Sequence, residues 1–274
     1  MIHKADASNQ AMVKRNNVEA VFAAIQQSDG ISRARLSKLL NLSPSTVTVI
    51  VDDLKAKGLV VDTGICDEAF GGVGRTAYAL DVNPAQHYLI GVEVAPEFIR
   101  SMAFDLKINP VAEDTKAYDA SQALLIDEIE RSIRRLLARL PGKRVYAAGC
   151  AFDLPKGYID YQKNEFEFTE PFGKNIDRLS LGALSGRLRM PVCANESAAI
   201  LGAAEQRLYH SGSKTFVYMY LADGVCFNII QDGHLLCGAH SPMSEIGHMS
   251  INLFGPRCAC GNRGCFELYV SNRA

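Results

Sequence analysis

Residues 245–267 read EIGHMSINLFGPRCACGNRGCFE, the most densely patterned part of the chain. The stretch contains one imidazole and three thiols, at His248, Cys258, Cys260 and Cys265. Nitrogen and sulfur donors at this spacing suit tetrahedral zinc, and the intervening glycines allow the tight turns that bring the ligands together. Because the protein would fill all four positions, no water is left for Lewis-acid chemistry, so the sequence predicts a structural zinc ion. The alternative is a loop with three free thiols.

The composition is that of an ordinary globular protein, with 274 residues, of which 48% are hydrophobic and 22% charged. This length allows one large domain or two smaller ones. The formal net charge of −1 excludes a polybasic protein, although DNA binding has to be judged domain by domain. The start, MIHKADASNQ, has no apolar signal-peptide core, and no apolar run is long enough to span a membrane. We therefore expect a cytoplasmic protein with reduced cysteines and no membrane partner.

The N-terminal part has the pattern of three short helices. Apolar residues at helical spacing predict a helix over residues 16–28 and a second over residues 32–40, which begins at a serine cap. Ser43 and Pro44 are typical of a helix start, and the third helix that they open is expected to end at Gly58. Two short helices separated by a tight turn indicate a helix-turn-helix.

Strands predicted at residues 59–63 and 76–80, joined by a glycine-rich loop at 71–75, would complete a winged helix-turn-helix. Through Val60 the chain has eight Lys/Arg and five Asp/Glu, a local excess of +3. Hydroxyl groups can bond to phosphates or bases, an exposed valine can contact a thymine methyl, and arginines can contact phosphates or the minor groove. The predicted DNA contacts are Arg33, Arg35, Ser43, Ser45, Thr46, Thr48, Val49 and Arg75.

A helical protein-interaction module is the alternative for this segment. The outward face of the third helix has no Arg or Lys before Lys55, so bidentate recognition of guanine from its first turns is not expected.

The remainder of the chain has the pattern of an α/β domain with a mixed sheet. We predict domains at residues 1–80 and 87–274 with a linker at 81–86. Strands are expected at residues 87–94, 98–106, 111–118, 144–152, 191–194, 215–221 and 225–231, and helices at 121–140, 174–189 and 196–210.

The motif from Glu245 to His248, followed by CACGNRGCFE at residues 258–267, resembles the signature of the ROK family of repressors, open reading frames and sugar kinases. Residues 31–60 are similar to the helix-turn-helix of ROK repressors, and residues 87–267 to the actin-like fold of sugar kinases. The resemblance implies an N-terminal winged helix-turn-helix followed by an actin-like ROK domain. Because family members continue well beyond the position of Ala274, it also implies a kinase-like domain that lacks its C-terminal segment.

The resemblance also assigns a sugar site. In ROK kinases, residues matching Glu245, His248 and Glu267 contact sugar hydroxyls, and an Asn-Asp pair supplies a sugar contact and the catalytic base. Here the pair is Asn195-Glu196, and the additional methylene displaces the carboxylate, so Glu196 is a degenerate base position. Its alternative role is an acid in the first turn of a helix.

Two glycine-rich phosphate loops of ATP-binding relatives are altered here. The first, resembling Asp-x-Gly-Gly-Thr, is EVAPE at residues 93–97, and the second, resembling Leu-Gly-Thr-Gly-x-Gly, is LADGVC at residues 221–226. Pro96 removes an N–H, and Glu97 and Asp223 add negative charge where phosphates would lie. The sequence therefore predicts no catalytic residue and no kinase activity.

These features predict a transcriptional regulator, a repressor of carbohydrate-utilisation genes that binds double-stranded operator DNA as a homodimer or homotetramer and senses a sugar or sugar phosphate. One alternative is a ROK kinase that phosphorylates a hexose with ATP. Another is a regulator controlled by a protein partner, because Ser241, Ser244 and His240 replace residues that kinases favour at the edge of the pocket.

Overall fold

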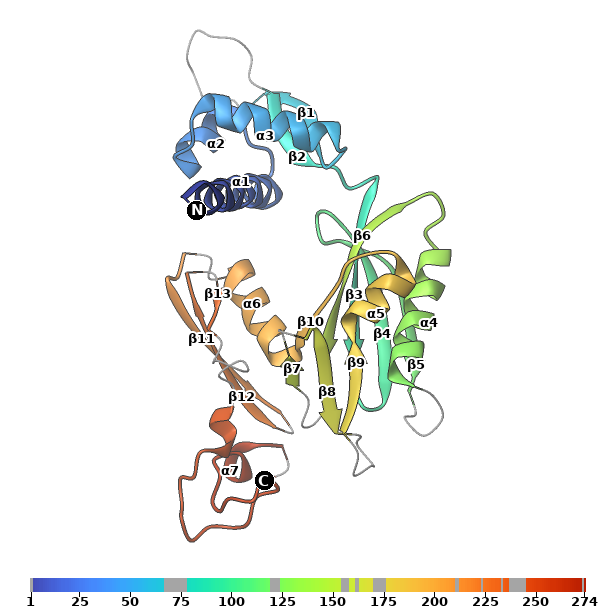
Figure 1. Cartoon of the computed structure of the whole chain (residues 1–274), viewed down its shortest axis with the longest axis vertical. Coiled ribbons are helices and arrows are strands. Elements are labelled where there is room, and N and C mark those ends of the chain that lie inside the picture. The colour runs from blue at the N-terminus through green and yellow to red at the C-terminus, as the bar shows by residue number, and fades with distance from the viewer. Residues whose placement is uncertain are drawn as a thin grey trace. The chain divides into compact units, whose positions relative to one another are not determined.

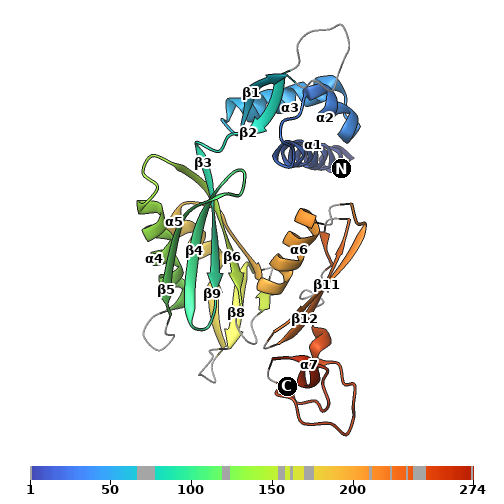
Figure 2. The same cartoon turned by 180° about the vertical axis from the view of Figure 1, so that it is seen from behind.

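The structure is a computed structural model that describes residues 2–66, 78–118, 124–153, 158–160, 163–169, 176–209, 212–222, 224–232, 234–236, 245–272 and 274. The chain forms two compact units, drawn in Figures 1 and 2. Unit 1 contains residues 1–89, 103–112 and 140–146, and unit 2 contains residues 90–102, 113–139 and 147–274. In the described residues, no helix combines the length and the apolar character needed to cross a membrane.

Unit 1 contains three helices and a two-stranded antiparallel sheet, as predicted. The elements are α1 (Ile2–Gln26), α2 (Arg33–Leu40), α3 (Pro44–Ala56), β1 (Val60–Cys66) and β2 (Tyr78–Val82). Their apolar faces form a core that includes Val21, Leu36, Val47, Leu54 and Leu80.

Side-chain caps fix the ends of the short helices. The Oγ of Ser32 accepts a hydrogen bond from the N–H of Arg35 at 3.3 Å, and that of Ser43 accepts one from Thr46 at 3.1 Å. Both N-caps were predicted from the residue types. The first helix begins earlier than the predicted residue 16, because apolar spacing marks only the segment that packs on the core, while upstream residues of good helix propensity continue the helix.

A five-stranded sheet has the order β10-β6-β3-β4-β5. Its strands are β3 (His87–Val94), β4 (Phe98–Asp105), β5 (Pro110–Ala117), β6 (Arg144–Phe152) and β10 (Val192–Glu196), and β10 is parallel to β6. Two helices, α4 (Leu125–Ala138) and α5 (Leu181–Leu188), lie on the same side of the sheet in both views (Figures 1 and 2). The strands of this sheet match the predicted ranges within two residues at each end.

A helix predicted over residues 174–189 is wrong in its first half. Residues Ile176–Ser180 form β9, which pairs with β8 (Glu165–Thr169), and β8 also pairs with β7 (Tyr158–Asp160). The helix α5 starts only after Ser180, whose Oγ accepts a hydrogen bond from the N–H of Ala183 at 3.2 Å. Pairing with the preceding strand β8 therefore overrides the local helical pattern.

The last described part of unit 2 contains α6 (Ser197–Tyr209), which contacts the hairpin of β11 (Thr215–Leu221) and β12 (Val225–Gln231). The short strand β13 (His234–Leu235) extends this sheet. A 3-10 turn, η1 (Glu245–His248), and the helix α7 (Glu267–Val270) flank the cysteine-rich loop.

Candidate functional site

Helix α3 has one face buried in the core of unit 1 and the opposite face exposed to solvent. Val47, Ile50, Val51 and Leu54 are buried in the core, whereas the Val49 side chain is 65% exposed on the opposite face. Val49 therefore lies outside the core of unit 1, on the face of α3 that is exposed to solvent.

Hydroxyl groups gather at the N-terminal end of α3. The Ser43 Oγ lies 2.9 Å from the Ser45 Oγ and 2.7 Å from the Thr46 Oγ1. The Thr48 Oγ1 instead donates to the Pro44 carbonyl at 2.8 Å, so it is bonded within the helix. The structure thus brings the predicted contacts Ser43, Ser45 and Thr46 together at one helix end.

The two predicted arginines of α2 differ in their surroundings. Arg33 donates to the Oδ1 of Asp52 on α3 at 2.8 Å, whereas Arg35 is exposed and forms no ion pair with the described part of the chain. Asp52 was not predicted from the sequence, although its spacing from Ser45 and Val49 places it on the same helix face. The predicted wing residue Arg75 lies outside the described residues.

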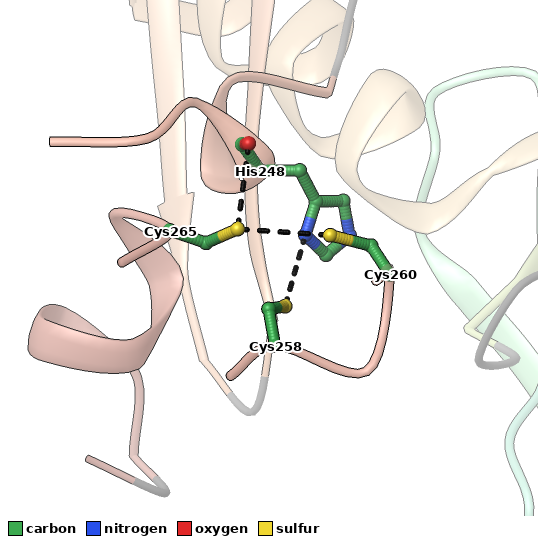
Figure 3. Close-up of side chains that lie close together, drawn as sticks. All are labelled: His248, Cys258, Cys260 and Cys265. Atoms are coloured by element: carbon green, nitrogen blue, oxygen red, sulfur yellow. Dashed lines mark hydrogen bonds between the residues drawn. The ribbon is translucent and has the colours of Figure 1, made fainter. Parts of the chain in front are cut away.

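The four predicted metal ligands converge in unit 2. Figure 3 shows the imidazole of His248 and the sulfur atoms of Cys258, Cys260 and Cys265 pointing toward one another, with all four ligand atoms within 4.8 Å. The Cys258 Sγ lies 3.6 Å from the His248 Nδ1, and the Cys260 Sγ lies 3.6 Å from the Cys265 Sγ.

These separations fit one tetrahedral ion. Zn–S bonds of about 2.3 Å and a Zn–N bond of about 2.0 Å place neighbouring donor atoms about 3.5–3.8 Å apart. The Cys265 and Cys258 side chains are buried, whereas Cys260 is exposed, so the cluster lies at the surface with one edge toward solvent. The donor set and its spacing can hold a metal ion.

A tightly folded backbone positions the ligands. Gly264 has φ +61°, and a Cβ at this position would lie 1.7 Å from the Asn252 carbonyl oxygen, so only glycine fits. Antiparallel bridges join Ser250 to Cys265 and Arg257 to Arg263, which fixes the cysteine-rich loop on both sides.

The protonation of the cysteines depends on their surroundings. Burial raises the pKa of the Cys265 thiol to about 12, whereas a hydrogen bond from the Asn262 backbone lowers the pKa of Cys260. A bound cation would favour the thiolate of Cys265, which is the form that binds a metal.

The structure describes only some of the predicted sugar contacts. Asn195 and Glu196 end β10, and the Asn195 Oδ1 accepts a hydrogen bond from the Glu196 N–H at 2.9 Å. Because α6 begins at Ser197, Glu196 precedes the helix and is not an acid of its first turn. The Glu245 side chain lies outside the described residues, as do His240, Ser241 and Ser244.

Glu267 contacts the segment that matches the second phosphate loop. Its Oε2 accepts a hydrogen bond from the Val225 N–H at 3.2 Å, and a Cβ on Gly224 would lie 3.4 Å from the same oxygen. Glu267 follows Cys265 by two residues, so the metal cluster and this carboxylate belong to one folded segment. Asp223 of the same loop lies outside the described residues.

Comparison with known proteins gives two family matches and several relatives. Residues 89–274 match the ROK family, and residues 17–61 match a winged helix-turn-helix DNA-binding family. The chain is 28% identical to the xylose repressor of Bacillus spizizenii over 276 residues, which cover 98% of this chain and 69% of the repressor.

Solved structures agree on the fold. A ROK family transcriptional regulator described as a homologue of the Escherichia coli Mlc protein superimposes with a TM-score of 0.76 and 26% identity, covering 96% of this chain and 66% of that one. The ROK hexokinase of Thermus thermophilus has a TM-score of 0.56 and 20% identity, covering 68% of this chain and 61% of that one. The predicted combination of a winged helix-turn-helix with an actin-like sugar-kinase fold is thereby confirmed. Because the matching family model covers more than half of its residues, the chain belongs to the ROK family.

Proposed function

We propose that the protein is a DNA-binding transcriptional regulator that represses carbohydrate-utilisation genes. In this proposal residues 1–80 bind operator DNA, residues 81–86 form the linker and residues 87–274 form the ROK domain. The observation that carries it is the exposed face of α3 in a winged helix-turn-helix, joined in one chain to a ROK domain. Similarity to the xylose repressor and to a ROK transcriptional regulator supports the same function.

The proposed DNA contacts follow from the chemistry of the α3 face. Ser43, Ser45 and Thr46 would bond to phosphates or base edges, and Val49 would contact a thymine methyl group. Arg35 would bind a phosphate directly, while Arg33 would first have to leave Asp52. Thr48 and Arg75 remain proposed contacts on their residue type alone.

The backbone of the two altered phosphate loops supports a protein without kinase chemistry. The Ala95 N–H donates to the Phe98 carbonyl, Pro96 has no N–H, and the Val225 N–H donates to Glu267. Phosphate loops act through N–H groups that point at phosphate oxygens, and these positions offer none. The Glu196 carboxylate would in addition be displaced from the position of a catalytic base.

The metal that fits the cluster best is zinc, held by His248, Cys258, Cys260 and Cys265. A Cys₃His set suits zinc, and four protein ligands leave no open position. The ion would act structurally: it would hold the loop of residues 248–265 and, through it, Glu267. Glu267, Glu245 and His248, with Asn195 and Glu196, form the proposed site for a sugar or sugar phosphate.

The effector would act by binding one conformation of the regulator more tightly than another. A homodimer or homotetramer would match the two-fold symmetry of operator DNA and would allow a change in the spacing of its DNA-binding heads.

The test is a gel-shift titration of the full chain with its own upstream DNA at low salt, with an unrelated duplex as the control. We expect preferential binding to the upstream DNA, lost in Val49→Glu, which puts a negative charge on the exposed α3 face. Leu201→Glu changes an exposed leucine of α6 in the same way and should retain binding. Equal affinity for both duplexes, or no binding, would contradict the proposal.

Two further assays separate the alternatives. Incubation with ATP, magnesium and a panel of hexoses should give no turnover, and robust phosphorylation would favour the kinase. Calorimetry with sugars and sugar phosphates should give at least one binding isotherm, and silence throughout would favour control by a protein partner.

A further inference from the structure

A basic pocket lies in unit 1, apart from the α3 face and the metal cluster. It has a volume of about 750 Å³ and is formed by three segments, residues 55–58, 85–87 and 141–144. Four of its lining side chains are basic, namely Lys55, Lys57, Lys143 and Arg144.

Hydrogen bonds between the three segments fix the shape of the pocket. The buried His87 bonds through its Nε2 to the Lys57 carbonyl oxygen at 3.0 Å, which ties the end of α3 to β3. The Arg144 N–H donates to the Gln86 carbonyl at 3.1 Å, which ties the start of β6 to the residue that precedes β3. Gly58 has φ +71°, a left-handed conformation that favours glycine, so the turn that leaves α3 at the pocket depends on this residue.

Two of the four basic side chains of the pocket form ion pairs with carboxylates. Lys55 pairs with Asp62, and Lys57 pairs with Asp53 at 2.7 Å. Lys143 and Arg144 form no ion pair with any residue that the structure describes; the Lys143 Nζ donates to the Ala85 carbonyl at 3.0 Å. Two cations without a carboxylate partner, next to two lysines, make a local potential that attracts anions.

Aromatic rings hold both unpaired cations in place. The Lys143 Nζ lies 5.4 Å from the centre of the Tyr88 ring. The Arg144 guanidinium carbon lies 5.3 Å from the centre of the Tyr146 ring. A cation held against a ring loses less conformational entropy when it binds an anion, so the pocket is partly preorganised.

The size and lining of the pocket favour a small, polar ligand over DNA. Its volume is that of a small-molecule site, but its lining is polar and basic where such sites are mostly apolar, so it suits a charged ligand. Lys57 lies about 18 Å along the helix from Ser45, at 1.5 Å per residue, and so at the opposite end from the hydroxyl groups that face DNA. Multiply charged phosphate groups match a cluster of lysine and arginine.

We propose that this pocket binds a small phosphate-bearing anion, with Lys143 and Arg144 as its principal contacts and Lys57 and Lys55 as further cations. Such an anion would connect the last turn of α3 to residues 85–87 and 141–144, and so would restrain the helix that the proposed function assigns to DNA. The binding itself does not depend on the proposed function; only its effect on DNA affinity does.

The experiment is isothermal titration of the full chain with sodium pyrophosphate, in metal-free buffer at constant ionic strength set with chloride. We expect saturable binding to the unmodified chain, weakened about tenfold or more in the double variant Lys143→Ala/Arg144→Ala, because two charge-assisted contacts are lost. The variant Lys143→Arg/Arg144→Lys keeps both charges and should keep most of the affinity. Lys116→Ala, at an exposed lysine of β5 outside the pocket, should bind as the unmodified chain does.

Absence of pyrophosphate binding to the unmodified chain, or equal affinity in the alanine double variant, would overturn the proposal. Extraction of metal by pyrophosphate would give the same signal in all four proteins and would count as equal affinity. A different outcome is that the unmodified chain does not bind pyrophosphate, while the double variant loses affinity for DNA and its DNA binding depends less on salt, by about two phosphate contacts. In that case Lys143 and Arg144 contact the DNA backbone, and the proposed small-anion site is wrong. If the unmodified chain binds pyrophosphate but does not bind DNA, and the double variant loses pyrophosphate, this proposal stands and only the proposed function is contradicted.

Discussion

The guanidinium of Arg33 donates to the carboxylate of Asp52 across 2.8 Å, and this contact joins the first turn of α2 to the outward face of α3. Both side chains are substantially exposed, so the pair contributes little to folding. On a face proposed to meet DNA, the same pair has a different effect: Asp52 repels phosphates and occupies an arginine that would otherwise bind one.

Asp52→Asn should therefore tighten DNA binding by about three- to tenfold at low salt, because it removes one repulsive charge and releases Arg33. The measurement is a fluorescence-anisotropy titration with the upstream duplex at several salt concentrations. Part of the gain should disappear in the double variant Asp52→Asn/Arg33→Ala. Unchanged or weaker binding by Asp52→Asn would show that this face does not meet DNA.

The metal cluster should contribute strongly to the stability of its loop. We expect one zinc per chain by elemental analysis, and Cys265→Ser should abolish bound zinc and lower the melting temperature, because Cys265 is fully buried and is one of the proposed ligands. Cys193→Ser is the matched control, since Cys193 is exposed and outside the cluster. A chain purified without stoichiometric zinc, or equal melting temperatures for both variants, would contradict the assignment.

Asp114 on β5 is a buried anchor for α4. Its side chain is 3% exposed and pairs with Arg135 at 2.9 Å and Arg139 at 3.3 Å. Asp114→Ala should lower the free energy of unfolding by roughly 2–3 kcal/mol, less than for a wholly buried pair because both arginines reach solvent.

Urea titration monitored by circular dichroism checks this value. Asp127→Ala, which removes an exposed carboxylate that pairs with Arg187, serves as the control and should cost under about 1 kcal/mol. An equal loss in the free energy of unfolding for the two variants would contradict the prediction that the buried Asp114 contributes more to stability than the exposed Asp127.

The Cys150 thiol in β6 should make stability depend on pH above the neutral range. Burial raises the pKa of Cys150 from its ordinary value of 9.0 to about 12. The folded chain therefore keeps this proton where the unfolded chain releases it. The stabilising contribution is complete below pH 9 and declines between pH 9 and 12, by up to about 1.4 kcal/mol per pH unit.

Urea midpoints at pH 8 and pH 10 should show a smaller decline for Cys150→Ala than for the unmodified chain. In the native state at pH 8, a thiol reagent should modify the exposed Cys193 and leave Cys150 unmodified. Rapid modification of Cys150 under these conditions would show that its thiol is accessible.

Local chemistry alone was enough to predict much of this protein. The serine caps at Ser32 and Ser43 are visible in the sequence because a cap needs only a hydroxyl and the next three residues. The clustering of the four candidate metal ligands was also predicted, because they lie within one short segment whose glycines allow tight turns.

Tertiary structure decided the features that join distant segments. The Val225 N–H met Glu267 across 42 residues, and residues 55–58 and 141–144 came together as a basic pocket. No short-range pattern encodes these contacts, because each depends on how the sheets and helices pack. Periodicity and capping act over a few residues, whereas the partners of a charge or a strand edge are set by the fold as a whole.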